Sequence, residues 1–157
     1  MEQIEELYRH VIREHSSNPR NCYILDDYTH SAHLNNTLCG DEITIYCRVA
    51  VQNDTERIRN ISFDATGCAI MKASASLLTD NVKGCTVETA SILASSFMAF
   101  LQGDSSMLDS DSPFLAFAPV RQYSSRIKCA VLPFQALTKA LQSPTLLSHG
   151  HLVERFL

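Results

Sequence analysis

Thiol side chains are the most chemically informative groups in this chain, which contains six cysteines. Three of them, Cys39, Cys68 and Cys129, stand where a predicted strand or helix begins or ends. A thiolate binds soft and borderline metal ions and is also the nucleophile of sulfur-transfer reactions. Asp41 adds a carboxylate two residues after Cys39. Three thiolates and one carboxylate suit a tetrahedral Zn²⁺ site, and equally an iron–sulfur cluster with one exchangeable ligand.

Glycines beside two of these cysteines indicate how the side chains come together. Gly40 permits a tight turn between Cys39 and Asp41, just before a strongly predicted strand, and such a turn aims thiolate and carboxylate the same way. Gly67 precedes Cys68 where a strand gives way to a helix. Unpaired N–H groups at a helix start favour the thiolate form, which binds metal or attacks sulfur. Both motifs therefore predict reactive thiolates at the ends of elements.

Cys129 is expected directly before the last helix, because Pro133 suits only the first turn of a helix. Element ends gather along one edge of a small domain, so the three thiols can meet there. The three cysteines lie far apart in the sequence, however, and their spacing matches no zinc finger. From local context alone, three unrelated cysteines in a reducing cell remain an alternative.

The other cysteines are interpreted as structural or incidental. Cys47 lies between Ile45 and Val49 on the apolar face of a predicted strand, and a buried cysteine usually behaves as a small hydrophobic residue. Cys22 lies in a predicted loop and Cys85 between two predicted helices. Neither has a partner at ligand spacing.

None of the histidines is expected to be a metal ligand. His33 is close in sequence to Cys39, but a histidine in a loop more often faces solvent. His15 is expected to cap or pack at the end of the first helix. His149 and His151 could chelate a metal only adventitiously, because they lie in the predicted tail.

Hydrophobic periodicity predicts the elements that must position these residues. Residues 2–16 carry an apolar stripe at helical spacing, and 18–31 form an ordered connection. Alternation over residues 43–51 and again over 61–65 predicts two strands paired as a hairpin. Residues 32–37 are expected to add an edge strand.

Helical spacing returns after the strands, with glycines where helices should end and Thr86 as an N-cap. The acidic loop over 104–112 is expected to be solvated surface, with a place in a docking rim as the alternative. The predicted helices lie at residues 70–84, 86–103, 113–118 and 131–142. The order of elements predicts an α+β fold, a small antiparallel sheet of about three strands with roughly four to five helices packed on it.

Length and composition fit one globular domain. The chain has 157 residues, of which 45% are hydrophobic and 19% are charged, and this balance argues against a disordered or membrane-embedded chain. We expect one domain over residues 1–144 and a loosely ordered tail over 145–157. The net charge of −4 argues against nucleic-acid binding. The acidic N-terminus lacks a signal-peptide pattern, so a cytoplasmic location with reduced cysteines is expected.

Several short segments occur in an order that matches a known family. They are Leu7-Tyr8, Asn18-Pro19-Arg20-Asn21, Cys39-Gly40-Asp41, Gly67-Cys68-Ala69-Ile70 and Arg126-Ile127-Lys128-Cys129. Together they resemble the U-type iron–sulfur cluster assembly family, which comprises IscU proteins, SufU proteins and the N-terminal domain of NifU. The resemblance runs from about Leu7 to Leu141, and it implies a SufE/NifU-like fold.

Two departures from the IscU pattern resemble the SufU branch. Lys128 stands where IscU proteins carry a histidine before the third cysteine. The interval between the second and third cysteines also contains an additional segment, 104–120. The Leu-Pro-Pro-Val-Lys segment that IscU proteins offer to a dedicated chaperone is missing, so that partnership is not expected.

The resemblance implies a sulfur acceptor that takes persulfide sulfur from a SufS-type cysteine desulfurase and supplies a downstream cluster-assembly complex. By position, the resemblance implies that the zinc ligands are Cys39, Asp41, Cys68 and Cys129. It also implies that Cys39 is the catalytic sulfur acceptor. Arg126 is expected to pair with a nearby negative charge, whose identity the sequence does not give. Two alternatives stay open. One is a scaffold that assembles and transfers a [2Fe–2S] cluster on the same ligands, and the other is a structural zinc domain that acts as an interaction module. Whether the chain is itself an enzyme also stays open.

Overall fold

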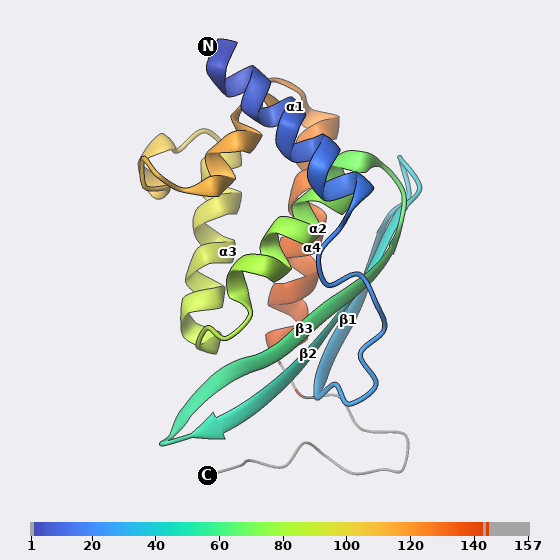
Figure 1. Ribbon diagram of the computed structural model, residues 1–157, viewed down its shortest axis with the longest axis vertical. Helices are drawn as coiled ribbons and strands as arrows, with labels where there is room; N and C mark the ends of the chain where they lie inside the picture. The colour runs from blue at the N-terminus through green and yellow to red at the C-terminus, as the bar shows by residue number, and fades with distance from the viewer. Residues whose placement is uncertain (1, 143, 145–157) are drawn as a thin grey trace.

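A three-stranded sheet with helices packed on one of its faces forms the body of the protein. The computed structural model describes residues 2–142 and 144. Figure 1 shows the helices gathered beside the sheet, with the β1–β2 turn and the β3–α2 connection at the same end of it. The elements are α1 (Glu2–Ser17), β1 (His30–Asn36), β2 (Asp41–Gln52), β3 (Thr55–Thr66), α2 (Ala69–Val82), α3 (Val87–Leu101), η1 (Ser105–Met107), η2 (Pro113–Gln122) and α4 (Ser124–Gln142), where η marks a 3₁₀-helix. The predicted α+β class is confirmed.

The sheet is antiparallel throughout, in the order β1-β2-β3. A two-residue turn at Asn53 and Asp54 joins β2 to β3, and both residues have the positive φ that such hairpin turns require. The predicted edge strand is confirmed as β1, and the predicted hairpin as β2 and β3, with strands longer than expected because the turn is short.

One face of β2 supplies the core beneath the helices. Ile43, Ile45 and Cys47 are completely buried, whereas Glu42 on the opposite face is exposed. This alternation is the period of a strand with one buried face. Burial raises the pKa of Cys47 to about 12, so this thiol stays protonated, and its predicted role as a core residue is confirmed.

Side-chain caps define the starts of α2 and α3. The Thr86 hydroxyl accepts a hydrogen bond from the N–H of Thr89 at 3.0 Å, as its predicted role as an N-cap requires. Cys68 caps α2 in the same way through its sulfur. Gly84, just after α2, has a φ of +87°, a left-handed conformation that favours glycine.

The predicted start of the last helix is wrong. Helix α4 begins at Ser124, because the carbonyl of Tyr123 accepts hydrogen bonds from the N–H groups of both Arg126 and Ile127 at 3.0 Å. Pro133 therefore lies inside the helix, and Cys129 lies on it rather than before it. The cost of an interior proline is offset by tertiary packing, since most of the helix surface around Pro133 is buried.

Aromatic side chains fill the core on the helical side of the molecule. We call Phe97, Phe114, Phe117 and Phe134 the phenylalanine cluster, and its residues come from α3, η2 and α4. The rings of Phe97 and Phe134 lie closest, with centroids 4.3 Å apart, and Phe97 also contacts the other two. The predicted turn over 113–118 thus extends to residue 122, because its phenylalanines anchor it against α3 and α4.

No helix among residues 2–142 is both long and apolar enough to cross a membrane. The predicted tail, 145–157, and the histidines in it lie outside the described residues. The division into one domain over 1–144 and a tail stays a prediction.

Candidate metal centre

Four side chains from three separate parts of the fold meet at the end of the sheet. We call Cys39, Asp41, Cys68 and Cys129 the thiol cluster. The sulfur atoms of Cys39 and Cys129 lie 3.8 Å apart, and the Cys68 sulfur lies 3.4 Å from Oδ2 of Asp41. One ligand atom each of Cys39, Asp41 and Cys129 lies within 4.8 Å of the others. The expected gathering of the three cysteines around the acid is therefore found.

The turn between β1 and β2 presents the first two residues of the cluster. The N–H groups of Cys39 and Gly40 both donate to the carbonyl of Asn36, at 3.3 and 2.9 Å. Gly40 has a φ of +75°, which permits the tight turn expected from the sequence. Asp41 then opens β2 with its side chain on the buried face, while Cys39 remains exposed.

Gly67 makes room for the buried carboxylate. Its φ of +144° already favours glycine, and a Cβ placed on it would overlap Oδ1 of Asp41 and come within 2.9 Å of the Asp41 Cα and Cγ atoms. In the space left by the missing side chain, the N–H of Cys68 donates to Oδ1 of Asp41 at 2.8 Å. This contact joins the start of β2 to the start of α2.

Burial and hydrogen bonding shift the pKa values of the carboxylate and of the Cys68 and Cys129 thiols in opposite directions. Burial alone would raise the pKa of Asp41, but donation from the Cys68 N–H and from the thiols of Cys129, Cys39 and Cys68 lowers it below its usual value. Burial raises the pKa of Cys68, and although the Met71 N–H opposes this, the net shift is upward. Burial, hydrogen bonding and the Asp41 charge also raise the pKa of Cys129.

These separations fit a tetrahedral zinc ion. Two thiolates bound to one such ion lie about 3.8 Å apart, and a thiolate and a carboxylate oxygen lie about 3.5 Å apart, since Zn–S and Zn–O bonds are about 2.3 and 2.1 Å. The observed distances of 3.8 Å between Cys39 and Cys129, and 3.4 Å between Cys68 and Asp41, match this geometry. The Cys68 sulfur lies outside the group whose ligand atoms are all within 4.8 Å of one another, so it must move closer to complete a four-ligand site. A cation would also replace the protons that the buried thiols now share with the carboxylate.

Access to the cluster is one-sided. Asp41 is fully buried and Cys129 is 7% exposed, whereas Cys39 is classed as exposed. Leu38, directly before Cys39, is 84% exposed. The thiol that an incoming molecule meets first is therefore Cys39.

A shallow groove of about 350 Å³ runs beside the exposed thiol. Leu38, Val131 and Leu132 give it apolar lining, and Lys128 contributes a positive charge. It lies between the β1–β2 turn and α4, so its walls carry the residues that immediately precede Cys39 and Cys129. A partner segment can lie against the protein here and reach Cys39.

Arg126 and Tyr8 lie close to the thiols of Cys68 and Cys129, and only the arginine was assigned a role from the sequence. The Arg126 guanidinium lies 4.5 Å from the centre of the Tyr123 ring. Burial raises the pKa of Tyr8, the nearby Arg126 charge opposes this, and the thiols of Cys68 and Cys129 add to the increase. Tyr8 belongs to the opening helix of the resemblance, but nothing local in that helix predicted its proximity to the thiols.

His15 and His33, the two of these histidines that the structure describes, contact residues outside the thiol cluster. His15 Nδ1 lies 2.7 Å from the Ser76 hydroxyl, which packs the end of α1 against α2. His33 lies on the exposed face of the sheet, with Nδ1 2.9 Å from the Thr44 hydroxyl and Nε2 3.6 Å from Glu42.

The acidic loop lies at the opposite end of α2 from Cys68. Asp109 and Asp111 line a groove together with Val82, the last residue of that helix, and Cys85, just beyond it. A helix of 14 residues is roughly 20 Å long, so this groove is separated from the thiol cluster. A place for this loop in a docking rim stays a prediction.

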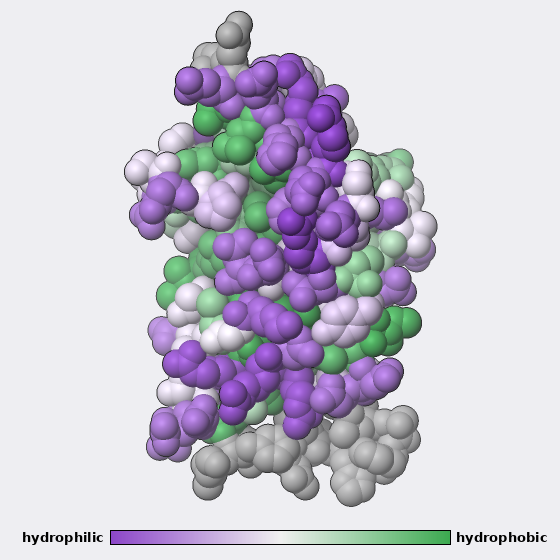
Figure 2. All heavy atoms as spheres, in the orientation of Figure 1, coloured by the Kyte–Doolittle hydropathy of each residue, from purple (hydrophilic) through white to green (hydrophobic). Residues whose placement is uncertain are grey.

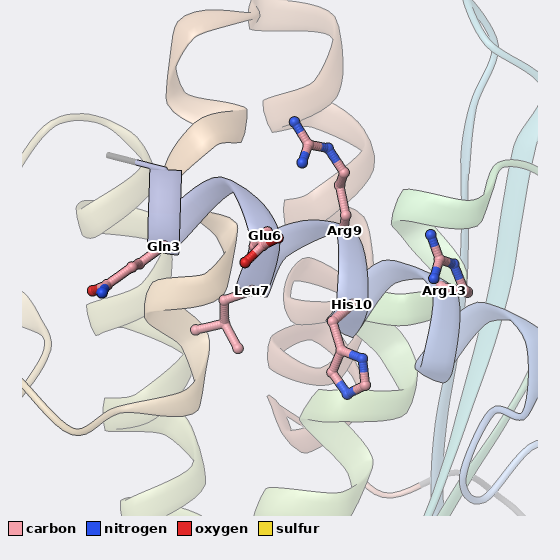
Figure 3. A pocket seen from close by; sticks show the side chains of 6 residues that line it. All are labelled: Gln3, Glu6, Leu7, Arg9, His10 and Arg13. Atoms are coloured by element: carbon pink, nitrogen blue, oxygen red, sulfur yellow. The ribbon is translucent and has the colours of Figure 1, made fainter.

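A second hollow follows the outer face of α1, and Figure 3 shows the side chains that line it, including Arg9, His10 and Arg13. None of its described lining residues is a thiol or belongs to the thiol cluster. In Figure 2 hydrophilic side chains gather over this helix at the top of the view. The hollow is therefore a polar surface feature, separate from the candidate metal centre.

Comparisons with known proteins agree with the geometry. The family model for the NifU-like N terminal domain matches residues 7–142. The zinc-dependent sulfurtransferase SufU of Bacillus subtilis is 36% identical over 88% of this chain and 91% of its own length. The iron–sulfur cluster assembly scaffold protein IscU of Streptococcus pyogenes is 33% identical over 90% of this chain and 87% of its own. Among solved structures, a SufU of Fervidobacterium islandicum, described as a scaffold protein for the SUF system, has a TM-score of 0.74 at 26% identity, covering 88% of this chain and 98% of that one.

Proposed function

This chain belongs to the NifU-like N-terminal domain family, and on that basis we propose that it serves iron–sulfur cluster assembly as a zinc-binding acceptor of sulfur from a cysteine desulfurase. The similarity to a SufU named as a zinc-dependent sulfurtransferase supports the chemistry, because it extends over nearly the whole chain. The proposed ligands are those of the thiol cluster: Cys39, Asp41, Cys68 and Cys129.

One observation carries the proposal of sulfur transfer. Within a cluster whose carboxylate is fully buried and whose Cys129 thiol is 7% exposed, the Cys39 thiol is open to the surface. A purely structural metal site has no need of an exposed ligand, since closed sites keep all four donors protected. A sulfur acceptor needs one, because the persulfide of another protein must come into contact with it.

The chain's own residues prepare Cys39 for this role. When bound, Zn²⁺ would hold the thiolates deprotonated without redox chemistry of its own. Asp41 is fixed by the Cys68 N–H, and Cys68 is held by its place at the start of α2, so neither is free to move toward a partner. Cys39 sits on a turn, next to the exposed Leu38, and is the donor that can leave the cluster at least cost.

The transfer itself is a displacement at sulfur. The Cys39 thiolate attacks the outer sulfur of the desulfurase persulfide, a new bond forms between the Cys39 sulfur and that atom, and the electron pair of the broken bond returns to the desulfurase cysteine. No net oxidation occurs, because one persulfide replaces another. The groove beside Leu38 and Lys128 accommodates the desulfurase segment that brings the persulfide.

Desulfurase stimulation tests the proposal. The wild-type chain, purified with equimolar zinc, should stimulate cysteine turnover by a SufS-type desulfurase, and Cys39→Ala should abolish the stimulation. Cys22→Ala is the matched control, because Cys22 is also an exposed cysteine but lies outside the thiol cluster. Unchanged stimulation by Cys39→Ala would remove the acceptor assignment.

A scaffold role is the second candidate, because several relatives are named as iron–sulfur cluster assembly scaffolds. Anaerobic reconstitution with iron and sulfide separates the two functions. A stable, transferable cluster with visible absorption supports a scaffold, and protein that only takes up zinc again supports the sulfur acceptor. A structural zinc domain predicts a third result, in which Cys39→Ala protein that retains zinc keeps full function.

A further inference from the structure

We infer that Cys129 discharges the persulfide formed on Cys39, by attacking the Cys39 sulfur and releasing the transferred sulfur as hydrogen sulfide. This inference rests on the proposed function, because it concerns what happens after Cys39 has accepted sulfur. It assigns Cys129 a chemical role in addition to its proposed role as a ligand.

The distances single out Cys129 among the cysteines of the cluster. Its sulfur lies 3.8 Å from that of Cys39, close to van der Waals contact. Cys68 does not belong to the group whose ligand atoms all lie within 4.8 Å of one another. The Cys68 sulfur is also held by the Met71 N–H at 3.5 Å and by the Asp41 carboxylate.

Burial decides which sulfur of the persulfide is attacked. The donor arrives from solvent, so the added outer sulfur enters on the exposed side of Cys39. Cys129, at 7% exposure, approaches Cys39 from the protein side. The atom nearest to it is therefore the Cys39 Sγ and not the added sulfur.

The step balances without another reactant. A bond forms between the sulfurs of Cys129 and Cys39, the bond from Cys39 to the outer sulfur breaks, and its electron pair leaves with that sulfur. Cys129 attacks as the thiolate that zinc would hold, so the added sulfur leaves as hydrosulfide and no proton transfer is needed. Two thiols are oxidised to one disulfide, and the sulfane sulfur is reduced to sulfide. Closing the pair brings the two sulfurs to about 2.05 Å.

Two consequences follow. The sulfur leaves in the oxidation state that iron–sulfur clusters contain, so no separate reductant is needed at the moment of release. The disulfide between Cys39 and Cys129 must then be reduced before the next cycle, so sustained sulfide production requires a dithiol reductant. A single turnover does not.

Single-turnover chemistry tests the inference. Wild-type protein is incubated with a SufS-type desulfurase and cysteine without added reductant, alkylated, and mapped by peptide mass spectrometry. We expect a disulfide between Cys39 and Cys129 together with equimolar sulfide, and neither in the same incubation without cysteine. A persulfide that persists on Cys39, or one that has moved to Cys129, would overturn the inference.

The proposed function and the inference can fail separately. If the desulfurase does not load Cys39, the proposed function is wrong. Inorganic polysulfide can then load Cys39 chemically, and the same disulfide mapping still tests the discharge step.

Two matched variants separate discharge from metal binding. Cys129→Ser and Cys68→Ser each remove one proposed thiolate ligand. After loading, Cys129→Ser should retain the persulfide on Cys39 and release no sulfide, whereas Cys68→Ser, which loses a proposed ligand but keeps the attacking thiol, should still release sulfide. Circular dichroism checks that both variants are folded. Equal retention by the two variants would show that loss of a ligand, and not loss of the attacking thiol, blocks discharge.

Discussion

The thiol cluster and the phenylalanine cluster each include a buried residue of α4, yet different forces hold them together. Cys129 belongs to the first and Phe134 to the second. The phenylalanines are apolar rings in mutual contact, which need no ligand. The thiol cluster instead places a buried carboxylate, the buried Cys129 thiol and the partly buried Cys68 thiol in a small space, held by hydrogen bonds from the Cys68 N–H and from the thiols themselves.

The difference teaches where stability and function reside in this small domain. An apolar cluster gains free energy from burial alone, and it supports the fold whether or not a metal is present. A polar cluster costs free energy to bury unless it is paired, so it is most stable when a cation is bound. If this division holds, loss of a phenylalanine and loss of the metal should destabilise the protein independently.

Phe97→Ala should destabilise the phenylalanine cluster. Phe97 is completely buried and contacts three other phenylalanines, so its removal should lower the free energy of unfolding by about 3–5 kcal/mol. Denaturant unfolding of the metal-loaded protein measures the loss. Ile92→Ala on the same helix is the control, because Ile92 is 59% exposed and should change stability by less than about 0.5 kcal/mol.

Metal removal should lower the stability contributed by the thiol cluster and leave that of the phenylalanine cluster unchanged. At a free zinc concentration roughly 100 times the Kd, binding adds about 2.7 kcal/mol to the free energy of unfolding, and chelation should remove this amount. Phe97→Ala should lose the same increment on chelation, because the substitution leaves the proposed ligands in place. A zinc increment that disappears in Phe97→Ala would show that the two clusters depend on each other.

Gly67→Ala and Gly40→Ala should destabilise the protein to different extents. Both positions have positive φ, which costs a residue with a side chain about 1–2 kcal/mol. Only at Gly67 does the added Cβ also meet Asp41, which adds about 1–3 kcal/mol of overpacking, whereas at Gly40 it meets nothing within 4 Å.

Zinc titration and denaturant unfolding should therefore separate the two glycine variants. Gly67→Ala should weaken zinc binding and lose more stability than Gly40→Ala. Equal losses would contradict the assigned role of Gly67.

His15 should give a small pH effect that belongs to neither cluster. Burial and the neighbouring Arg20 lower its pKa below the usual 6.5, against the weaker opposing effects of Asp80 and Glu14. The unfolded chain therefore takes up this proton at a higher pH than the folded protein does. The contribution of neutral His15 is complete above pH 6.5 and declines as the pH falls below it.

Unfolding should be measured from about one pH unit above to about one unit below the usual pKa of histidine. Stability should fall more steeply toward acid in the wild type than in His15→Gln, because the lowered pKa of His30 contributes equally to both proteins. A slope that is the same in both proteins would assign the effect to other groups.

Local chemistry in the sequence was enough to predict most elements. The alternation around Ile45 and Cys47, the Thr86 cap and the glycine after α2 each act within a few residues, so they can be read from neighbours alone. The start of α4 could not be predicted in this way. Pro133 argues locally for a helix start, but burial of the surrounding side chains against the sheet and α3 outweighs that preference.

The amino-acid sequence alone identified the three thiols and the carboxylate that stand in motifs resembling a known family. It also predicted the turn at Gly40. Three features follow from tertiary packing instead: Asp41 is buried against Gly67, Cys39 is the most exposed thiol of the cluster, and Cys129 is its nearest thiol neighbour. The physical reason is that burial and proximity depend on residues distant in sequence, whereas turns and caps depend on adjacent ones.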